Sequence, residues 1–209
     1  MMRKGNTSLL LGTLLLGLSF CLGACSKSED EEVVTQNQSF VTGSTSGEDV
    51  FFSNMKNPLV VEHDERHKHT LELDINNDFV KDYRLVSEER WDRNVQPARL
   101  IAKELRLEIL NGNWVVDDGG DLNVPAILDR NQDLEDANLK WSTSGAMVVA
   151  GYYPDNTSQN RESWNGEAEK YIGLKVVKGE ETWVAWVQIS VGDYDNYILY
   201  NYAGRKVIE

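Results

Sequence analysis

Apolar and polar residues alternate along two stretches of the chain, 70–75 (TLELDI) and 104–109 (ELRLEI). Successive side chains of a strand point to opposite faces of a sheet, so this period of two predicts half-buried strands in both places. Residues 98–103 (ARLIAK) contain good helix formers, but the alternation continues after them through Ile109. The sequence therefore favours one long strand over a helix in this region.

Two turn signals link predicted strands. Asn111-Gly112 stands between 104–109 and 114–116 (WVV), and both residue types accept the positive φ angles that tight hairpin turns require. The segment 178–181 (KGEE) lies between 171–177 (YIGLKVV) and 182–191, and it predicts a second hairpin. Several short strands without a helical period indicate an all-β fold, and we expect a single jelly-roll-like β-sandwich.

The N-terminal segment has the outline of a secretory signal peptide. A short apolar run, LLLGTLLLGLSFCL at 9–22, follows Arg3 and Lys4, and it is shorter than the roughly 18 residues of a spanning helix. The run ends in Leu22-Gly23-Ala24-Cys25, which resembles the lipobox of bacterial lipoproteins. This resemblance implies that residues 1–24 are removed and that Cys25 carries a lipid anchor. The alternative is an ordinary signal peptide with an incidental cysteine.

The residues after Cys25 are acidic and then polar. The run at 29–32 (EDEE) resembles the export tag by which one group of Gram-negative bacteria sends lipoproteins to the outer face of the outer membrane; a solvated acidic linker is the alternative. Ser, Thr, Gln and Gly dominate 35–48, as in a flexible tether. We expect a signal peptide at 1–24, a tether at 25–49 and a β-sandwich domain at 50–209, lipid-anchored in the cell envelope.

The charge of the chain limits its partners. The formal net charge is −13, and loss of the signal peptide removes two further positive charges. Nucleic acid and anionic lipid surfaces are bound through basic patches, so the sequence predicts neither as a partner. Cys21 lies in the signal peptide and Cys25 is expected to be acylated, which leaves the domain without a thiol for a disulfide, a nucleophile or a metal.

The C-terminal part resembles a closing pattern of bacterial exported β-proteins. The matching residues are Tyr171-Ile172-Gly173, then Trp186, then Tyr202-Ala203, while Val184-Ala185 stand where Tyr and Gly are usual. The same group of proteins often begins its domain with a turn similar to DINNDFVKD at 74–82. The resemblance implies fold and export, and it assigns no chemistry.

The segment 74–82 also has the spacing of a calcium loop. Calcium takes six to eight oxygen ligands, and five residues stand at suitable places: Asp74, Asn76, Asp78, the carbonyl of Val80, and Asp82. Phe79 occupies the position where glycine normally permits the sharp turn, and Leu85 the position of a bidentate glutamate. A calcium site and a polar turn neutralised by water and Lys81 both remain open.

Two other groups of polar residues have weaker metal signals. Asp129, Asn131, Asp133 and Glu135 repeat an every-second-residue spacing, but a solvated loop explains it better. All three histidines lie at one strand entry, as His63, His67 and His69. Their spacing suits zinc or copper, but structural zinc needs four convergent ligands and no cysteine is available, so exposed histidines are the simpler interpretation.

The sequence contains no recognisable catalytic machinery. It has no G-x-S-x-G motif, and no pair stands out among its 34 acidic residues as the two carboxylates of a glycosidase. Tyr152, Tyr153 and Trp164 lie among Asp and Asn residues, and we expect them to form a ligand-binding edge, because exposed aromatic faces stack on sugar rings.

These observations predict an exported, lipid-anchored binding or interaction protein of the bacterial cell envelope that contacts a glycan or a protein. Calcium is the cofactor that the sequence suggests most strongly. Whether the protein is an enzyme stays open, with binding favoured. The alternatives are a carboxylate-dependent hydrolase of an extracellular polymer and a purely structural envelope lipoprotein.

Overall fold

The computed structural model describes residues 39–53, 55–61, 68–120 and 123–207, which belong to one compact unit, Gln38–Glu209. The predicted signal peptide, Cys25, the acidic run, His63 and His67 lie outside the described residues. Within those residues the chain forms strands and one short 3₁₀ turn, Thr157–Gln159, but no α-helix. The same part of the chain has no helix long and apolar enough to cross a membrane.

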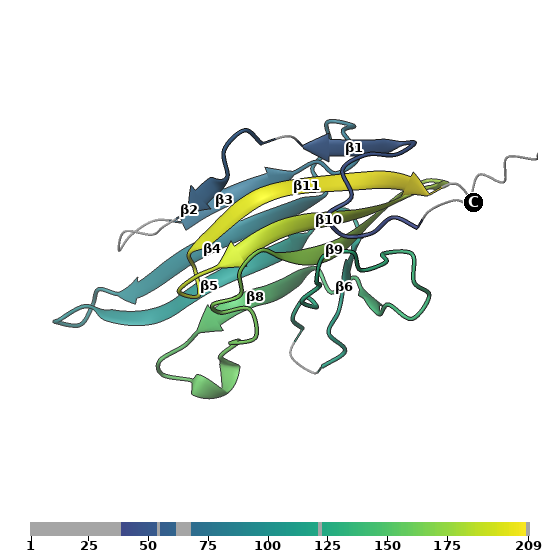
Figure 1. Ribbon diagram of the computed structural model, residues 1–209. Coiled ribbons are helices and arrows are strands. Elements are labelled where there is room, and N and C mark those ends of the chain that lie inside the picture. Colours follow the sequence, from purple (N-terminus) through teal and green to yellow (C-terminus); the bar gives the residue numbers. More distant parts are fainter. Residues whose placement is uncertain (1–38, 54, 62–67, 121–122, 208–209) are drawn as a thin grey trace, which may run out of the picture. The chain divides into compact units, whose positions relative to one another are not determined.

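Two antiparallel sheets make up this unit (Figure 1). The four-stranded sheet has the order β3-β4-β5-β8, with bounds β3 (Lys68–Leu73), β4 (Tyr83–Asp92), β5 (Arg99–Ile109) and β8 (Ala146–Tyr152). The seven-stranded sheet has the order β1-β11-β10-β9-β6-β7, and β2 also pairs with β11. Its bounds are β1 (Val50–Ser53), β2 (Leu59–Val61), β6 (Trp114–Val116), β7 (Trp141–Ser142), β9 (Lys170–Lys178), β10 (Glu181–Val191) and β11 (Tyr197–Val207).

The all-β sandwich prediction is confirmed, as is the long strand through Ile109. The β9–β10 hairpin is also confirmed, with Lys178 opposite Glu181 at its turn. Asn111 and Gly112 form the expected turn with φ angles of 56° and 74°, but the hairpin predicted there is wrong. Since β5 already pairs with β4 and β8, it has no free edge for β6, and the turn instead carries the chain into the other sheet.

The main core lies between the two sheets. Leu85, Leu105 and Leu107 of the small sheet and Val187 and Ile189 of the large sheet belong to this core. Tyr83 also ties the sheets together: its hydroxyl oxygen lies 2.7 Å and 2.8 Å from the carbonyl oxygens of Trp114 and Lys175, and it accepts the Lys175 N–H at 3.1 Å. Burial raises the pKa of Tyr83 well above its usual value, so the hydroxyl keeps its proton.

A second apolar cluster includes Trp186, Leu128, Leu134 and Phe40. Trp183 packs instead against the main core, so these two tryptophans of β10 point to opposite faces, as an odd separation along a strand requires. Phe40 is 2% exposed and its neighbour Val41 bridges to Asp133. The flexible tether was expected to continue to residue 49, but these contacts show that the folded unit begins about ten residues earlier.

Candidate functional site

The β4–β5 hairpin and the β10–β11 turn, residues 192–196, lie at one end of the sandwich, which we call the far end. Figure 1 shows the hairpin projecting beyond the neighbouring strands. Strand β8 pairs with β5 only as far as Lys103, which stands opposite Tyr152, so no described strand lies beside the part of β5 nearer the hairpin tip.

Two tyrosines pack together at this far end. The rings of Tyr152 and Tyr194 are 5.3 Å apart at an angle of 33°, and both side chains are half-buried. The N–H of Tyr194 donates to the side-chain oxygen of Asn165 at 2.9 Å, and the residue adopts a φ of 52°. The turn is therefore held in a defined conformation that keeps part of both rings at the surface.

Tyr153 does not join this pair. Its hydroxyl donates to Glu104, which projects from the small sheet, and its N–H donates to Asn160 at 2.8 Å. Burial is the main cause that raises the pKa of Tyr153, and the hydrogen bond to Glu104 raises it further. Tyr153 directly follows the last residue of β8, and of the two predicted tyrosines only Tyr152 packs against Tyr194 of the turn.

Trp164 is not a surface residue, and the expectation that it presents a face to a ligand is wrong. Its side chain is 0% exposed, packs in the main core, and donates its indole N–H to the carbonyl of Pro125 at 2.8 Å. The neighbouring backbone is fixed to the strand ends by the N–H of Gly166, which donates to Val191 at 3.0 Å, and by reciprocal bonds between Arg161 and Gly151. These long-range bonds direct the indole inward.

A charged cluster centred on Lys103 also lies at the far end. The Lys103 ammonium is 2.9 Å from Glu89, 2.8 Å from Asp193 and 3.9 Å from Asp195. Burial acts to lower the pKa of Lys103, but the bonds to Asp193 and Glu89 outweigh it and raise the pKa. Lys103 is therefore charged, and it compensates part of the negative charge of three carboxylates.

Asp195 is the unusual member of this cluster. The residue is 0% exposed, and neither side-chain oxygen has a hydrogen-bond partner in the structure. Burial raises the pKa of Asp195 to about 6, an effect that the charge of Lys103 partly offsets. The turn around it is held by Ser87, whose hydroxyl donates to the Asp195 carbonyl. Sequence reasoning missed this cluster, although an Asp-Tyr-Asp turn between two strands was a signal for it.

The arrangement at the far end suits binding better than catalysis. Tyr152 and Tyr194 offer partly exposed rings, and Asp193, with 59% of its side chain exposed, offers acceptor oxygens beside them. Asp195 has the shifted pKa expected of a general acid, but a general acid must reach the atom that it protonates. Because Asp195 is fully buried, it acts inside the turn and not on a ligand.

The predicted calcium loop is one hydrogen-bonded turn between β3 and β4. Asp74 accepts the N–H groups of Asp78 at 3.1 Å and Phe79 at 2.8 Å, while Asp78 accepts that of Val80 at 2.8 Å. The Asn76 side-chain amide donates to Asp78 at 3.0 Å. The loop thus brings the predicted residues together, and the side-chain oxygens of Asp74 and Asp78 accept hydrogen bonds from N–H groups of the loop itself.

The charges of this loop have protein partners. Asp78 forms an ion pair with Lys178, and the hydrogen bond from Lys178 lowers the pKa of Asp78. Asp82 turns inward to accept the Ile75 N–H at 2.8 Å and the Asn113 amide at 3.3 Å; burial raises its pKa. In the described ranges, no three His, Cys, Asp or Glu side chains converge as metal ligands do. Calcium binding stays a prediction.

The residues of the second acidic stretch have separate partners. Asp129 pairs with Lys170 at 2.7 Å, Glu135 pairs with Arg205, and Asp133 accepts the N–H of Glu135 at 2.8 Å. Of the histidines, His69 is described, and its ring lies 3.4 Å from the hydroxyl of Tyr197. Among the residues that the structure describes, neither region gathers a set of metal ligands.

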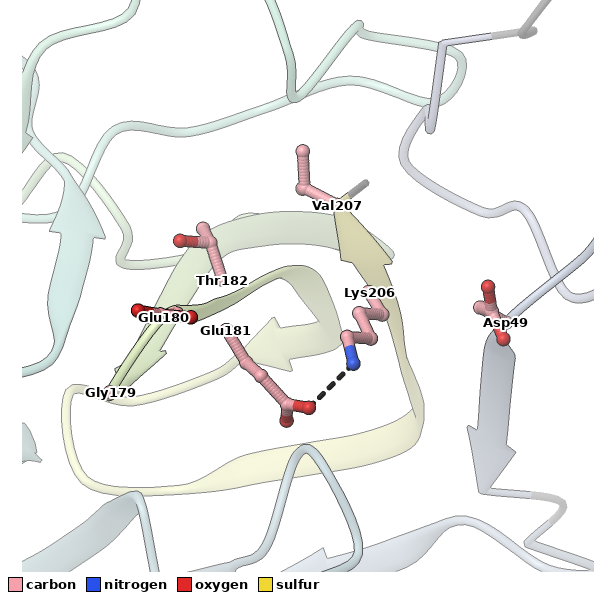
Figure 2. A pocket seen from close by; sticks show the side chains of 7 residues that line it. All are labelled: Asp49, Gly179, Glu180, Glu181, Thr182, Lys206 and Val207. Atoms are coloured by element: carbon pink, nitrogen blue, oxygen red, sulfur yellow. Dashed lines mark hydrogen bonds and ion pairs between the residues drawn. The ribbon is translucent and has the colours of Figure 1, made fainter. Parts of the chain in front are cut away.

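An open recess of about 820 Å³ lies at the end of the sandwich opposite the tyrosines, which we call the near end (Figure 2). It is lined by Asp49, Gly179, Glu180, Glu181, Thr182, Lys206 and Val207. Figure 2 shows the side chains of Glu181 and Lys206 meeting across it in an ion pair. The Lys206 amine is thus engaged by Glu181, and we assign no chemistry to the recess.

Comparison of the chain with protein-family models, with curated proteins and with solved structures gives no match. The functional argument therefore depends on the residues themselves.

Proposed function

We propose that the protein is an exported, lipid-anchored binding module of the bacterial cell envelope that contacts a glycan through its far end. The lipobox at Leu22–Cys25 and the acidic run after it support the anchor and the location. The half-exposed Tyr152–Tyr194 pair is the single observation that carries the binding role.

The chemistry of the far end favours a neutral glycan. Pyranose rings have apolar faces that stack on tyrosine, and nearby carboxylate oxygens accept bonds from sugar hydroxyls. Asp193 is placed to accept such bonds, and the negative charge of the chain disfavours acidic polymers. The hydrolase alternative has less support, because the two carboxyls with a raised pKa, Asp82 and Asp195, are both buried.

Affinity gel electrophoresis of the full chain through a panel of neutral polysaccharides tests this proposal. We expect one polysaccharide to retard the protein, and we expect Tyr152→Ala and Tyr194→Ala each to lose the retardation. Trp114→Ala is the matched control, because it removes a 37% exposed aromatic side chain elsewhere on the domain. Equal mobility of all four proteins in every gel would contradict glycan binding.

Two further measurements separate the alternatives. Release of reducing ends from the retarding polysaccharide would favour the hydrolase, whereas retardation without turnover favours binding. Mass spectrometry of the membrane fraction tests the anchor, and an unacylated Cys25 would contradict it.

A further inference from the structure

The β3–β4 loop exposes two large apolar side chains. Phe79 is 89% exposed and Val80 is 48% exposed. Phe79 adopts a φ of 68°, a left-handed conformation that glycine accepts freely and that phenylalanine adopts only at a cost. Its N–H is fixed by Asp74, and the preceding Asp78 is fixed by Lys178. The loop thus presents Phe79 in a defined position from which the fold gains no buried apolar area.

This loop lies at the near end of the sandwich. Its partner Lys178 belongs to the β9–β10 turn, which lines the same recess as Asp49 and Lys206. On its other side, Ile75 packs closely on β11, since a Cβ added at Gly204 would lie 3.0 Å from the Ile75 side chain. The far end with the tyrosine pair is at the opposite ends of the same strands.

The described chain also starts toward the near end. Phe40 lies against Arg205, with 5.7 Å from the guanidinium carbon to the ring centre, two residues before the end of β11. Cys25 precedes Ser39 by 14 residues. At about 3.3–3.6 Å per residue, a chain of that length reaches at most roughly 50 Å. A lipid on Cys25 therefore keeps the near end within reach of the bilayer.

We propose that Phe79 and Val80 insert into the interfacial region of the bilayer in which Cys25 is anchored. This inference rests on the proposed lipid anchor. Insertion would orient the domain with its near end on the membrane and the Tyr152–Tyr194 pair facing away from it. The loop would then define how far the glycan-binding end projects from the membrane surface.

The size of the effect fits a tethered contact. Burial of one large apolar side chain shifts an equilibrium by about ten- to a hundredfold, which alone is too little to recruit a soluble domain. A tether provides an effective concentration on the order of millimolar, at which a weak contact becomes occupied. The formal net charge of the chain is −13, so insertion should not require anionic lipid.

A fluorescent label beside Phe79 tests the proposal in the full, acylated protein reconstituted into phosphatidylcholine vesicles. With Cys25 acylated, Lys81→Cys introduces the only free thiol, and it is modified with an environment-sensitive fluorophore. We expect vesicle reconstitution to raise its emission at least twofold and spin-labelled lipid to quench it. Gln96→Cys at the exposed tip of the β4–β5 hairpin is the matched control, and its label should remain aqueous.

A second variant isolates the role of Phe79. Phe79→Gly in the Lys81→Cys background keeps the left-handed conformation accessible, so the loop should fold while the rise in emission is lost. A label at 81 that stays aqueous in vesicle-bound protein would overturn insertion and leave the anchor intact. A rise that occurs without vesicles and grows with protein concentration would indicate contact between protein molecules and would also overturn it. If mass spectrometry finds Cys25 of the protein from the membrane fraction to be unacylated, the anchor is overturned and, with it, this inference.

Discussion

Replacement of the buried Asp195 by asparagine should stabilise the folded unit at neutral pH. The folded-state pKa of Asp195 is about 6, against 3.8 for an unperturbed aspartate. A difference of about two pKa units corresponds to roughly 3 kcal/mol of unfolding free energy, at 1.36 kcal/mol for each unit. The folded state thus prefers the protonated carboxyl, and the ionised form costs stability.

The direction of the pH dependence follows from linkage. Because the pKa is higher in the folded state, the stability contributed by protonated Asp195 is fully present below about pH 3.8 and is lost as the pH rises through about 6. Asparagine has the shape of the protonated carboxyl and does not titrate. We therefore expect the stability of Asp195→Asn relative to the parent protein to rise by up to roughly 3 kcal/mol between pH 4 and pH 8.

Urea unfolding of Gln38–Glu209, followed by tryptophan fluorescence at intervals from pH 4 to pH 8, measures this difference. Taking the variant relative to the parent cancels the contribution of the other acids. Asp193→Asn is the control, because its exposed pair with the same Lys103 should be worth only about 0–1 kcal/mol. A stability difference for Asp195→Asn that is flat with pH would show that the buried carboxyl does not carry the expected penalty.

Three further predictions concern the rest of the domain. Tyr83→Phe removes the hydroxyl that bridges the two sheets and should lower the unfolding free energy by about 1–3 kcal/mol, measured by urea denaturation; an unchanged midpoint would contradict this role. Phe79→Gly removes a left-handed phenylalanine and should raise the melting temperature slightly, since the strain of about 1–2 kcal/mol exceeds the entropic cost of glycine, and a lower melting temperature would contradict it. If the β3–β4 loop binds calcium, a hundredfold excess over Kd should stabilise the protein by about 2.7 kcal/mol relative to EDTA, and Asp78→Ala should abolish the gain; equal melts in calcium and EDTA would identify a polar turn.

One residue of the candidate site, Tyr152, could be predicted from the sequence. Tyr152 was identified because it is an aromatic residue among Asp and Asn, and it does lie at the far end. Glu89, Lys103 and Asp195 come from β4, β5 and the β10–β11 turn, respectively, and no local pattern links segments so far apart. Trp164 has the same polar neighbours as an exposed aromatic, and only its bond to Pro125 and its burial exclude it from the surface.

The sequence by itself determined the strands around residues 70–75, 104–109, 171–177 and 182–191 and the hairpin at residues 178–181, because these depend on a period of two and on local turn chemistry. The tertiary structure alone decided that β6 leaves the sheet of β5, that Phe40 joins the folded unit and that Asp195 is buried. Alternation along a strand predicts to which face of the sheet each side chain points relative to its neighbours. Which strands lie side by side, and which face is covered, depends on burial and hydrogen bonding between segments that are distant in the chain.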